Sequence, residues 1–340
     1  MTDLGKGCIF VQVDAGDPQL SLFAAPAPTE SSKKAEYFPL LGGSFVDPHA
    51  ASSGSLVIDP YRGCEFGCAA CGLRGHGPEG ASDRRITVRA DAAVALAEDL
   101  ARPELAGRGL ILGAAGDPYQ PAERMFRLTR RLLDVIRAAP ARPLALFSRS
   151  DLIRSDLARL AKLAERQPLS IGIICGSDDE ELLHWFEPGA PAPRSRLRAL
   201  RLLRQRGVRT GLLMGPLLPG LNDAEEALRR LLAQARAADA SFVGFGMPDL
   251  AEPAHRRLIA WLERRAPELH QRYRAAFGEG ERYRRTVDER WARILAEEGF
   301  GHAEAGGHFA GPDPAYLRLY GGARRDSAGP GGPRGGRSPH

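Results

Sequence analysis

The sequence predicts an α/β fold built on parallel strands. Short apolar runs alternate along the chain with longer segments whose apolar residues recur at helical spacing. Six strands and the helices between them follow this alternation, which is the pattern of parallel βα units. Several strands are continuous apolar runs, as expected where both faces of a sheet are covered. Periodicity alone leaves two architectures open, an open sheet and a barrel.

The expected elements begin at residue 55 and follow one another closely. We expect strands at 56–58, 109–113, 144–147, 169–174, 208–214 and 242–245. We expect helices at 90–102, 121–138, 151–165, 194–206 and 222–238. Local signals support the helix ends, because Pro121 stands near the start of one helix and Gly207 follows the end of another.

The flanking segments divide the chain into four parts. Residues 1–50 are expected to be mostly irregular, with a short apolar run at 8–13 that fits a strand. Residues 51–250 form the α/β core, and residues 251–320 form a C-terminal extension of amphipathic helices. Residues 321–340, rich in Gly, Pro and Arg, are expected to be disordered.

Composition bounds the class of protein. A chain of 340 residues with 43% hydrophobic content can bury a sizeable core. No apolar run reaches the roughly 18 residues of a membrane helix, and the N-terminus lacks the plan of a signal peptide. Five cysteines, an odd number with three clustered, argue against a disulfide framework. We therefore expect a cytoplasmic protein without a membrane partner.

The net charge does not establish a nucleic-acid partner. The formal charge is +5, but the last twenty residues hold four Arg and one Asp, so the other 320 residues carry only +2. The region 252–299 interleaves basic and aromatic residues, but it contains nine Asp and Glu as well as eleven Arg, so its charges nearly balance. A solvated amphipathic face explains this region more simply than a phosphate-binding surface.

Three cysteines stand together in the segment that follows the first strand, spaced C-x3-C-x2-C: Cys64, Cys68 and Cys71. Thiolates are soft ligands that suit iron–sulfur clusters, zinc or Cu(I). A closed structural zinc site needs four ligands, and no second pair of cysteines exists. Three thiolates fit a [4Fe–4S] cluster that keeps one iron open. Zinc completed by His76 and an accidental group of thiols are the alternatives.

The cysteine spacing resembles the signature of the radical S-adenosylmethionine (SAM) superfamily. The surrounding Pro-Tyr-Arg-Gly-Cys-Glu-Phe-Gly-Cys is similar to that of its spore-photoproduct-lyase-like branch. The resemblance covers roughly residues 55–250 and implies a partial (β/α)6 TIM-type barrel with its active site at the carboxyl ends of the strands. That signature usually has an aromatic residue before the third cysteine. This chain has Ala70 there and Gly72 after the cysteine, so the packing around the cofactor must differ.

The resemblance also implies the chemistry. The three cysteines would hold a [4Fe–4S] cluster, and SAM would chelate the open iron through its amino and carboxylate groups. One electron, from a donor such as ferredoxin or flavodoxin, would cleave SAM to methionine and a 5′-deoxyadenosyl radical that abstracts hydrogen from a substrate. The sequence does not identify that substrate. The alternative from another class is a non-catalytic iron–sulfur electron carrier or sensor.

Four residues at other strand ends match positions near SAM in the branch: Asp117, Arg149, Ser177 and Glu187. Asp117 lies in an Asp-Pro-Tyr-Gln-Pro segment where the SAM amino group is held. Arg149 replaces a lysine near the SAM carboxylate, and Ser177 matches a hydroxyl near the ribose. Glu187 belongs to a similar Glu-Pro segment. Without the resemblance, Asp117 belongs to an ordinary turn and Arg149 is a surface arginine.

A hydrogen-donating residue is the last candidate. Cys175 ends an apolar run, so it is either a buried inert thiol or a catalytic hydrogen-atom donor. Photoproduct lyases carry a donor cysteine at the end of the second strand, and this chain has Ala114 there. We therefore predict no efficient repair of the spore photoproduct, although a DNA-photoproduct-repair lyase stays as an alternative.

Overall fold

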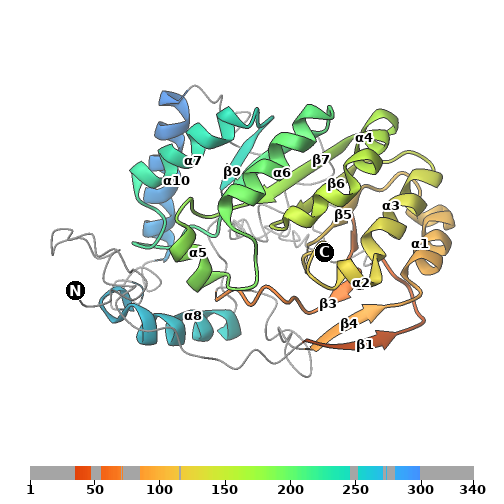
Figure 1. Cartoon of the computed structure of the whole chain (residues 1–340), viewed down its shortest axis with the longest axis horizontal. Helices are drawn as coiled ribbons and strands as arrows, with labels where there is room; N and C mark the ends of the chain where they lie inside the picture. Colours follow the sequence, from red (N-terminus) through yellow and green to blue (C-terminus); the bar gives the residue numbers. More distant parts are fainter. Residues whose placement is uncertain are drawn as a thin grey trace, which may run out of the picture.

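The computed structural model describes residues 35–46, 55–69, 71, 85–114, 116–245, 252–270, 273 and 280–298. The predicted strand at 8–13, the tail at 321–340, Ala70 and His76 lie outside these residues. Figure 1 shows a curved sheet with helices along its outer side and a second, smaller sheet at one edge.

The main sheet has six parallel strands. Each is hydrogen-bonded to the strand of this sheet that comes next along the chain. They are β2 (Leu56–Ile58), β5 (Leu110–Leu112), β6 (Leu144–Ser148), β7 (Leu169–Ile174), β8 (Arg209–Met214) and β9 (Val243–Phe245). The sheet is not closed between β2 and β9 among the described residues, as expected of a partial barrel. The predicted α/β fold with a six-stranded parallel sheet is confirmed.

Side chains alternate between the two faces of this sheet, as the pleat requires. Five helices cover the outer face: α1 (Ala92–Ala101), α3 (Leu128–Ala138), α4 (Leu157–Arg166), α6 (Pro193–Gln205) and α7 (Glu225–Ala237). Ile58 and Leu112 belong to the core between strands and helices. Val57, Ile111 and Phe147 belong instead to the cluster that fills the inner face.

The smaller sheet was not predicted. It contains β1 (Glu36–Leu40), β4 (Arg85–Arg89) and β3 (Tyr61–Arg62), in the order β1-β4-β3, with β1 parallel and β3 antiparallel to β4. Within the segment 1–50, expected to be mostly irregular, Glu36–Leu40 forms a strand. This sheet packs on α2 (Glu123–Phe126), where the Tyr37 and Phe126 rings meet edge to face at 5.1 Å.

Two predicted helices differ from the structure. The helix expected at 121–138 is divided into α2 and α3 by Arg127, whose left-handed backbone (φ 50°, ψ 39°) interrupts the helical turn. The Glu123 carboxylate accepts hydrogen bonds from the backbone N–H groups of Thr129 and Arg130 at the start of α3. The helix expected at 151–165 begins as the 3-10 helix η3 (Asp151–Asp156) before α4. A second 3-10 helix, η2 (Pro103–Leu105), and α5 (Glu180–Phe186) were not predicted.

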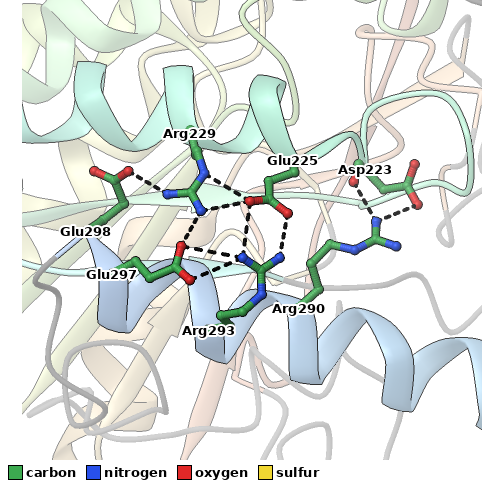
Figure 2. A network of polar contacts seen from close by, with 7 residues as sticks. All are labelled: Asp223, Glu225, Arg229, Arg290, Arg293, Glu297 and Glu298. Carbon is green, nitrogen blue, oxygen red and sulfur yellow. Dashed lines mark hydrogen bonds and ion pairs between the residues drawn. The ribbon is translucent and has the colours of Figure 1, made fainter.

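The expected C-terminal helices are present as α8 (Glu252–Arg265) and α10 (Gly280–Glu297). Val287, Trp291 and Ile294 of α10 join the same buried core as the barrel strands. Figure 2 shows how charged side chains of α7 and α10 meet. No helix among the described residues has the length and apolar character needed to cross a bilayer.

Candidate active site

The cysteine loop begins at Gly63, directly after the short strand β3, which follows the carboxyl end of β2. Gln120, in the loop after β5, holds it from one side. Its amide oxygen accepts from Glu65 N at 3.0 Å, and its amide nitrogen donates to Gly63 O at 3.1 Å. The Glu65 carboxylate in turn accepts from Ala122 N at 2.6 Å. Three polar contacts therefore fix the first half of the loop to the end of β5.

The segment after α5 holds the loop from the other side. Ala69 N donates to Phe186 O at 2.9 Å, and Gly189 N donates to Phe66 O at 3.0 Å. Gly189 approaches so closely that an added Cβ would lie 2.5 Å from the carbonyl oxygen of Glu65. The cysteine loop is thus clamped between the loops that follow β5 and α5, and only glycine fits at 189.

The three thiols of this loop lie close enough to influence one another. Cys68 is buried, Cys64 and Cys71 are half-buried, and none forms a disulfide. Burial raises the pKa of Cys64, and negative charge on Asp117 and Cys68 raises it further. Burial also raises the pKa of Cys68, while Arg149 acts in the opposite direction. Metal coordination would convert such thiols to thiolates.

The cysteine loop offers a donor set of three soft thiols. Within the described part of the chain, no three His, Cys, Asp or Glu side chains are grouped around a common metal position. In a [4Fe–4S] cluster each thiolate would bind a different iron, so the three thiols would surround the cluster and not one ion. The nearby carboxylate of Asp117 is already occupied by three hydrogen bonds. Soft thiolates are therefore the donors that the loop offers.

Asp117 joins the ends of two strands. Its carboxylate accepts from Ser148 Oγ at 2.7 Å, from Arg149 N at 2.7 Å and from Tyr119 N at 2.9 Å. Burial raises its pKa even though these bonds oppose the shift. The carboxylate thus fixes the loop after β5 to the end of β6, and its predicted contact with the SAM amino group remains a prediction.

Arg149, Glu187 and Arg196 form a buried ionic group beside Cys68. Arg149 Nη1 lies 2.6 Å from the Cys68 sulfur and 3.5 Å from a Glu187 oxygen. The other Glu187 oxygen lies 2.6 Å from Arg196 Nη1. Burial alone would raise the pKa of Glu187, but Arg196 and then Arg149 outweigh it, so the pKa is lowered. Two cations therefore surround one carboxylate next to the thiols.

Ser177 and Cys175 lie after β7. Ser177 Oγ accepts from Asp179 N at 3.1 Å, at the start of α5. Cys175 Sγ donates to the Ser177 carbonyl at 3.1 Å, and its side chain belongs to the core on the helix side of the sheet. Burial raises the pKa of this thiol to about 11. This placement favours the inert buried thiol over a donor that faces the barrel interior.

The structure brings most of the predicted site residues to one place, and it adds three that sequence reasoning missed. Cys64, Cys68, Asp117, Arg149 and Glu187 share the carboxyl end of the sheet. The three missed residues are Gln120, Glu65 and Arg196. Each lies inside a segment with a recognisable motif, but only tertiary contacts reveal its partner.

Comparison with known proteins identifies the family. The family model described as the Radical SAM superfamily matches residues 58–232. An uncharacterised protein of Mycobacterium tuberculosis is 32% identical over 274 residues, which cover 77% of this chain and 79% of the relative. An uncharacterised protein of Methanocaldococcus jannaschii is 24% identical over 200 residues, or 57% of this chain and 72% of that one.

Solved structures agree on the fold. A mutant of spore photoproduct lyase superposes with a TM-score of 0.57 at 16% identity, covering 79% of this chain and 80% of that chain. The same lyase complexed with dinucleoside spore photoproduct gives 0.51 at 17% identity, covering 68% and 66%. At this identity the likeness concerns the fold, a partial barrel, and not the substrate. From the family match and the mycobacterial relative together, we conclude that the chain belongs to the radical SAM superfamily.

Proposed function

We propose that this chain is an enzyme that cleaves SAM reductively at a [4Fe–4S] cluster held by Cys64, Cys68 and Cys71, and abstracts hydrogen from a substrate. The observation that carries the proposal is the clamped three-thiol loop at the carboxyl edge of a parallel sheet, with Arg149 directly beside Cys68. When bound, the cluster would supply the electron for SAM cleavage.

The protein's own contribution is positioning and charge. Gln120 and Gly189 fix the thiol-bearing loop, so the three sulfurs keep their spacing. The buried Arg149 guanidinium has the fork geometry that matches a carboxylate, such as that of SAM. Phe66 is a buried residue of the cysteine loop itself, and Phe147 is a buried residue of the cluster on the inner face of the barrel.

The test is anaerobic reconstitution of the full chain with iron and sulfide, followed by addition of SAM and dithionite. We expect brown absorbance near ~400 nm from the thiolate-bound cluster and formation of 5′-deoxyadenosine. Cys64→Ala, Cys68→Ala and Cys71→Ala should each lose both signals, whereas Cys8→Ala and Cys175→Ala should keep them.

The outcomes separate the alternatives. A full iron complement and activity in any one of the three cysteine-loop variants would refute the ligand assignment. A stable cluster without 5′-deoxyadenosine would favour the non-catalytic electron carrier or sensor. Zinc in place of iron, after purification without oxygen, would point to a structural metal site.

A further inference from the structure

The loop that follows β8, residues 215–224, starts from the same carboxyl edge of the main sheet as the cysteine loop. Its Leu218 and Leu221 share an apolar cluster with Phe186 of α5. Ala69 of the cysteine loop packs against this cluster and donates its N–H to Phe186 O at 2.9 Å. The loop after β8 therefore borders the candidate active site, although none of the predicted cluster or SAM ligands belongs to it.

Asn222 ties this loop to the loop that follows β7. Its side-chain nitrogen donates to Gly176 O at 2.8 Å and to Pro216 O at 2.9 Å, and its side-chain oxygen accepts from Leu218 N at 2.7 Å. The two loops are in close contact, since a Cβ added to Gly176 would lie 3.1 Å from the Asn222 nitrogen. Asn222 thus fixes the backbone directly before Ser177, the residue predicted to lie near the SAM ribose.

Asp223 attaches the same turn to the C-terminal helix α10. One of its carboxylate oxygens accepts from Gly220 N at 2.7 Å and closes the turn. Arg290 Nη1 of α10 donates to the backbone carbonyl of Asp223 at 3.0 Å and lies 3.8 Å from the other carboxylate oxygen (Figure 2). The Arg290 guanidinium therefore holds the main chain of the residue that follows Asn222.

The helix that carries Arg290 is itself firmly anchored. Val287, Trp291 and Ile294 of α10 are buried in the main core. Arg293, three residues after Arg290, makes ion pairs with the side chains of Glu225 and Glu297 and is more exposed than Arg290. Two arginines of one helix thus have different tasks, because only Arg290 is bonded to the backbone of the turn in these contacts.

We propose that Arg290 is a positioning residue of the candidate active site, which acts through Asp223 and Asn222 on the loop at Gly176 and Ser177. This inference deepens the proposed function and rests on it for the link to SAM. A loop that is fixed in advance loses less conformational freedom when a ligand binds beside it, so its fixation favours binding. The C-terminal extension then contributes to SAM binding without touching SAM.

The first experiment measures hydrogen exchange of the reconstituted full chain by mass spectrometry, without SAM. Arg290→Met keeps a long apolar stem and a good helix former but cannot donate a hydrogen bond. We expect peptides covering residues 174–180 and 215–223 to exchange several-fold faster in this variant. Arg293→Met is the matched control and should leave both peptides unchanged. Arg290→Lys should restore most of the protection, because an ammonium group can donate to the Asp223 carbonyl.

The second experiment titrates the same proteins with SAM by calorimetry. Arg290→Met should weaken SAM binding roughly threefold to tenfold, within the range for residues that act on a site without touching its ligand. The cluster absorbance should stay, because Gln120 and Gly189 hold the thiol loop independently. Asn222→Ala should weaken SAM binding at least as much. In that background Arg290→Met should add nothing further, since the two residues act in series.

The outcomes separate this inference from the proposed function. Unchanged exchange of both peptides in Arg290→Met, or equal acceleration in Arg293→Met, overturns the positioning role. Faster exchange with unchanged SAM affinity overturns its link to SAM. Absence of SAM binding by the unmodified protein would refute the proposed function and that link with it, whereas the exchange measurement decides the coupling between α10 and the loop after β7 without any ligand.

Discussion

Arg149 lies where the buried charges and the thiols meet. Its guanidinium touches Cys68 and Glu187, and Glu187 also pairs with Arg196. Buried charges are costly unless they are paired, and the Asp117 carboxylate also acts electrostatically on Arg149. A guanidinium beside the thiols can form charge-assisted hydrogen bonds to a carboxylate ligand.

We expect Arg149→Ala to weaken SAM binding by ~1.5–3 kcal/mol, the range for a hydrogen bond to a charged group. The cluster absorbance should remain, since no thiolate is lost. The measurement is calorimetric titration of the reconstituted protein with SAM, and Arg154→Ala, whose partner is the nearby Asp151, serves as the control. Unchanged SAM affinity in Arg149→Ala would limit this residue to packing against Glu187 and Cys68.

Asp99 on α1 anchors the described segment at 44–46. Its carboxylate accepts from Phe45 N at 2.6 Å, from Val46 N at 3.0 Å and from Ser44 Oγ at 3.1 Å. Burial alone would raise the pKa of this carboxyl, but the hydrogen bonds outweigh burial and lower it. A lowered folded-state pKa means that the ionised carboxylate stabilises the fold above the unfolded pKa. That contribution is lost as the pH falls through the folded pKa.

Asp99→Asn should therefore reduce the free energy of unfolding at pH 7 by ~1–3 kcal/mol, because an amide cannot reproduce the charge-assisted bonds. The difference from the unmodified protein should shrink as the pH falls below about 3.9, the unfolded reference value. Urea denaturation over this pH range measures both effects, with the exposed neighbour Glu98→Gln as control. A constant difference at every pH would show that the effect is steric.

At the scale of elements, α10 is attached to α7 by two kinds of contact. Figure 2 shows Arg229 and Glu225 of α7 interleaved with Arg293 and Glu297 of α10. Behind this exposed network, Trp291 is buried in the main core. Exposed ion pairs contribute little because water and salt screen them, whereas burial of an aromatic side chain contributes much.

We therefore expect Trp291→Ala to cost ~3–5 kcal/mol of stability, as for other large-to-small aromatic changes in a core. Arg293→Ala should change stability far less, and its effect should fade at high salt. Guanidinium denaturation is unsuitable because it is itself a salt, so urea with and without added sodium chloride is the measurement. A larger loss in Arg293→Ala than in Trp291→Ala would mean that the ion network holds the helix.

The elements differ in how far sequence could predict them. The six strands of the barrel have local signatures, and the structure places each within about two residues of its expected bounds. The break at Arg127 has no such signature, because arginine seldom adopts a left-handed backbone and the cause lies in the Glu123 carboxylate. The pairing of β1 with β4 joins segments far apart in the chain, and periodicity does not report such pairing.

In the candidate site, too, some features can be predicted from the sequence and others cannot. The cysteines carry their chemistry in their spacing, so the sequence alone identifies them. The contact of Arg149 with Cys68 and the clamp by Gln120 depend on loops from different strands meeting at one edge. The orientation of Cys175 depends on the strand register, which assigns it to the helix side of the sheet. Sequence could propose that residue for catalysis but could not say which way it faces.

At the scale of the whole molecule, the fold it shares with spore photoproduct lyase raises the question of DNA repair. Ala114 follows β5 and packs against the inner cluster of the barrel. An alanine side chain cannot donate the hydrogen atom that quenches a substrate radical. Of the four cysteines in the described part of the chain, three belong to the cysteine loop and Cys175 is enclosed on the helix side. The charge outside the last twenty residues is only +2.

We therefore expect no efficient conversion of the spore photoproduct to thymines. The measurement is incubation of ultraviolet-damaged DNA that carries the photoproduct with reconstituted protein, SAM and dithionite, followed by analysis of the released bases. Formation of 5′-deoxyadenosine in the same tube is the control, because it shows that the enzyme is active while the DNA stays unrepaired. Clean repair would contradict the prediction, and loss of that repair in Cys175→Ala would then mean that this thiol reaches the substrate after a rearrangement of the loop that follows β7.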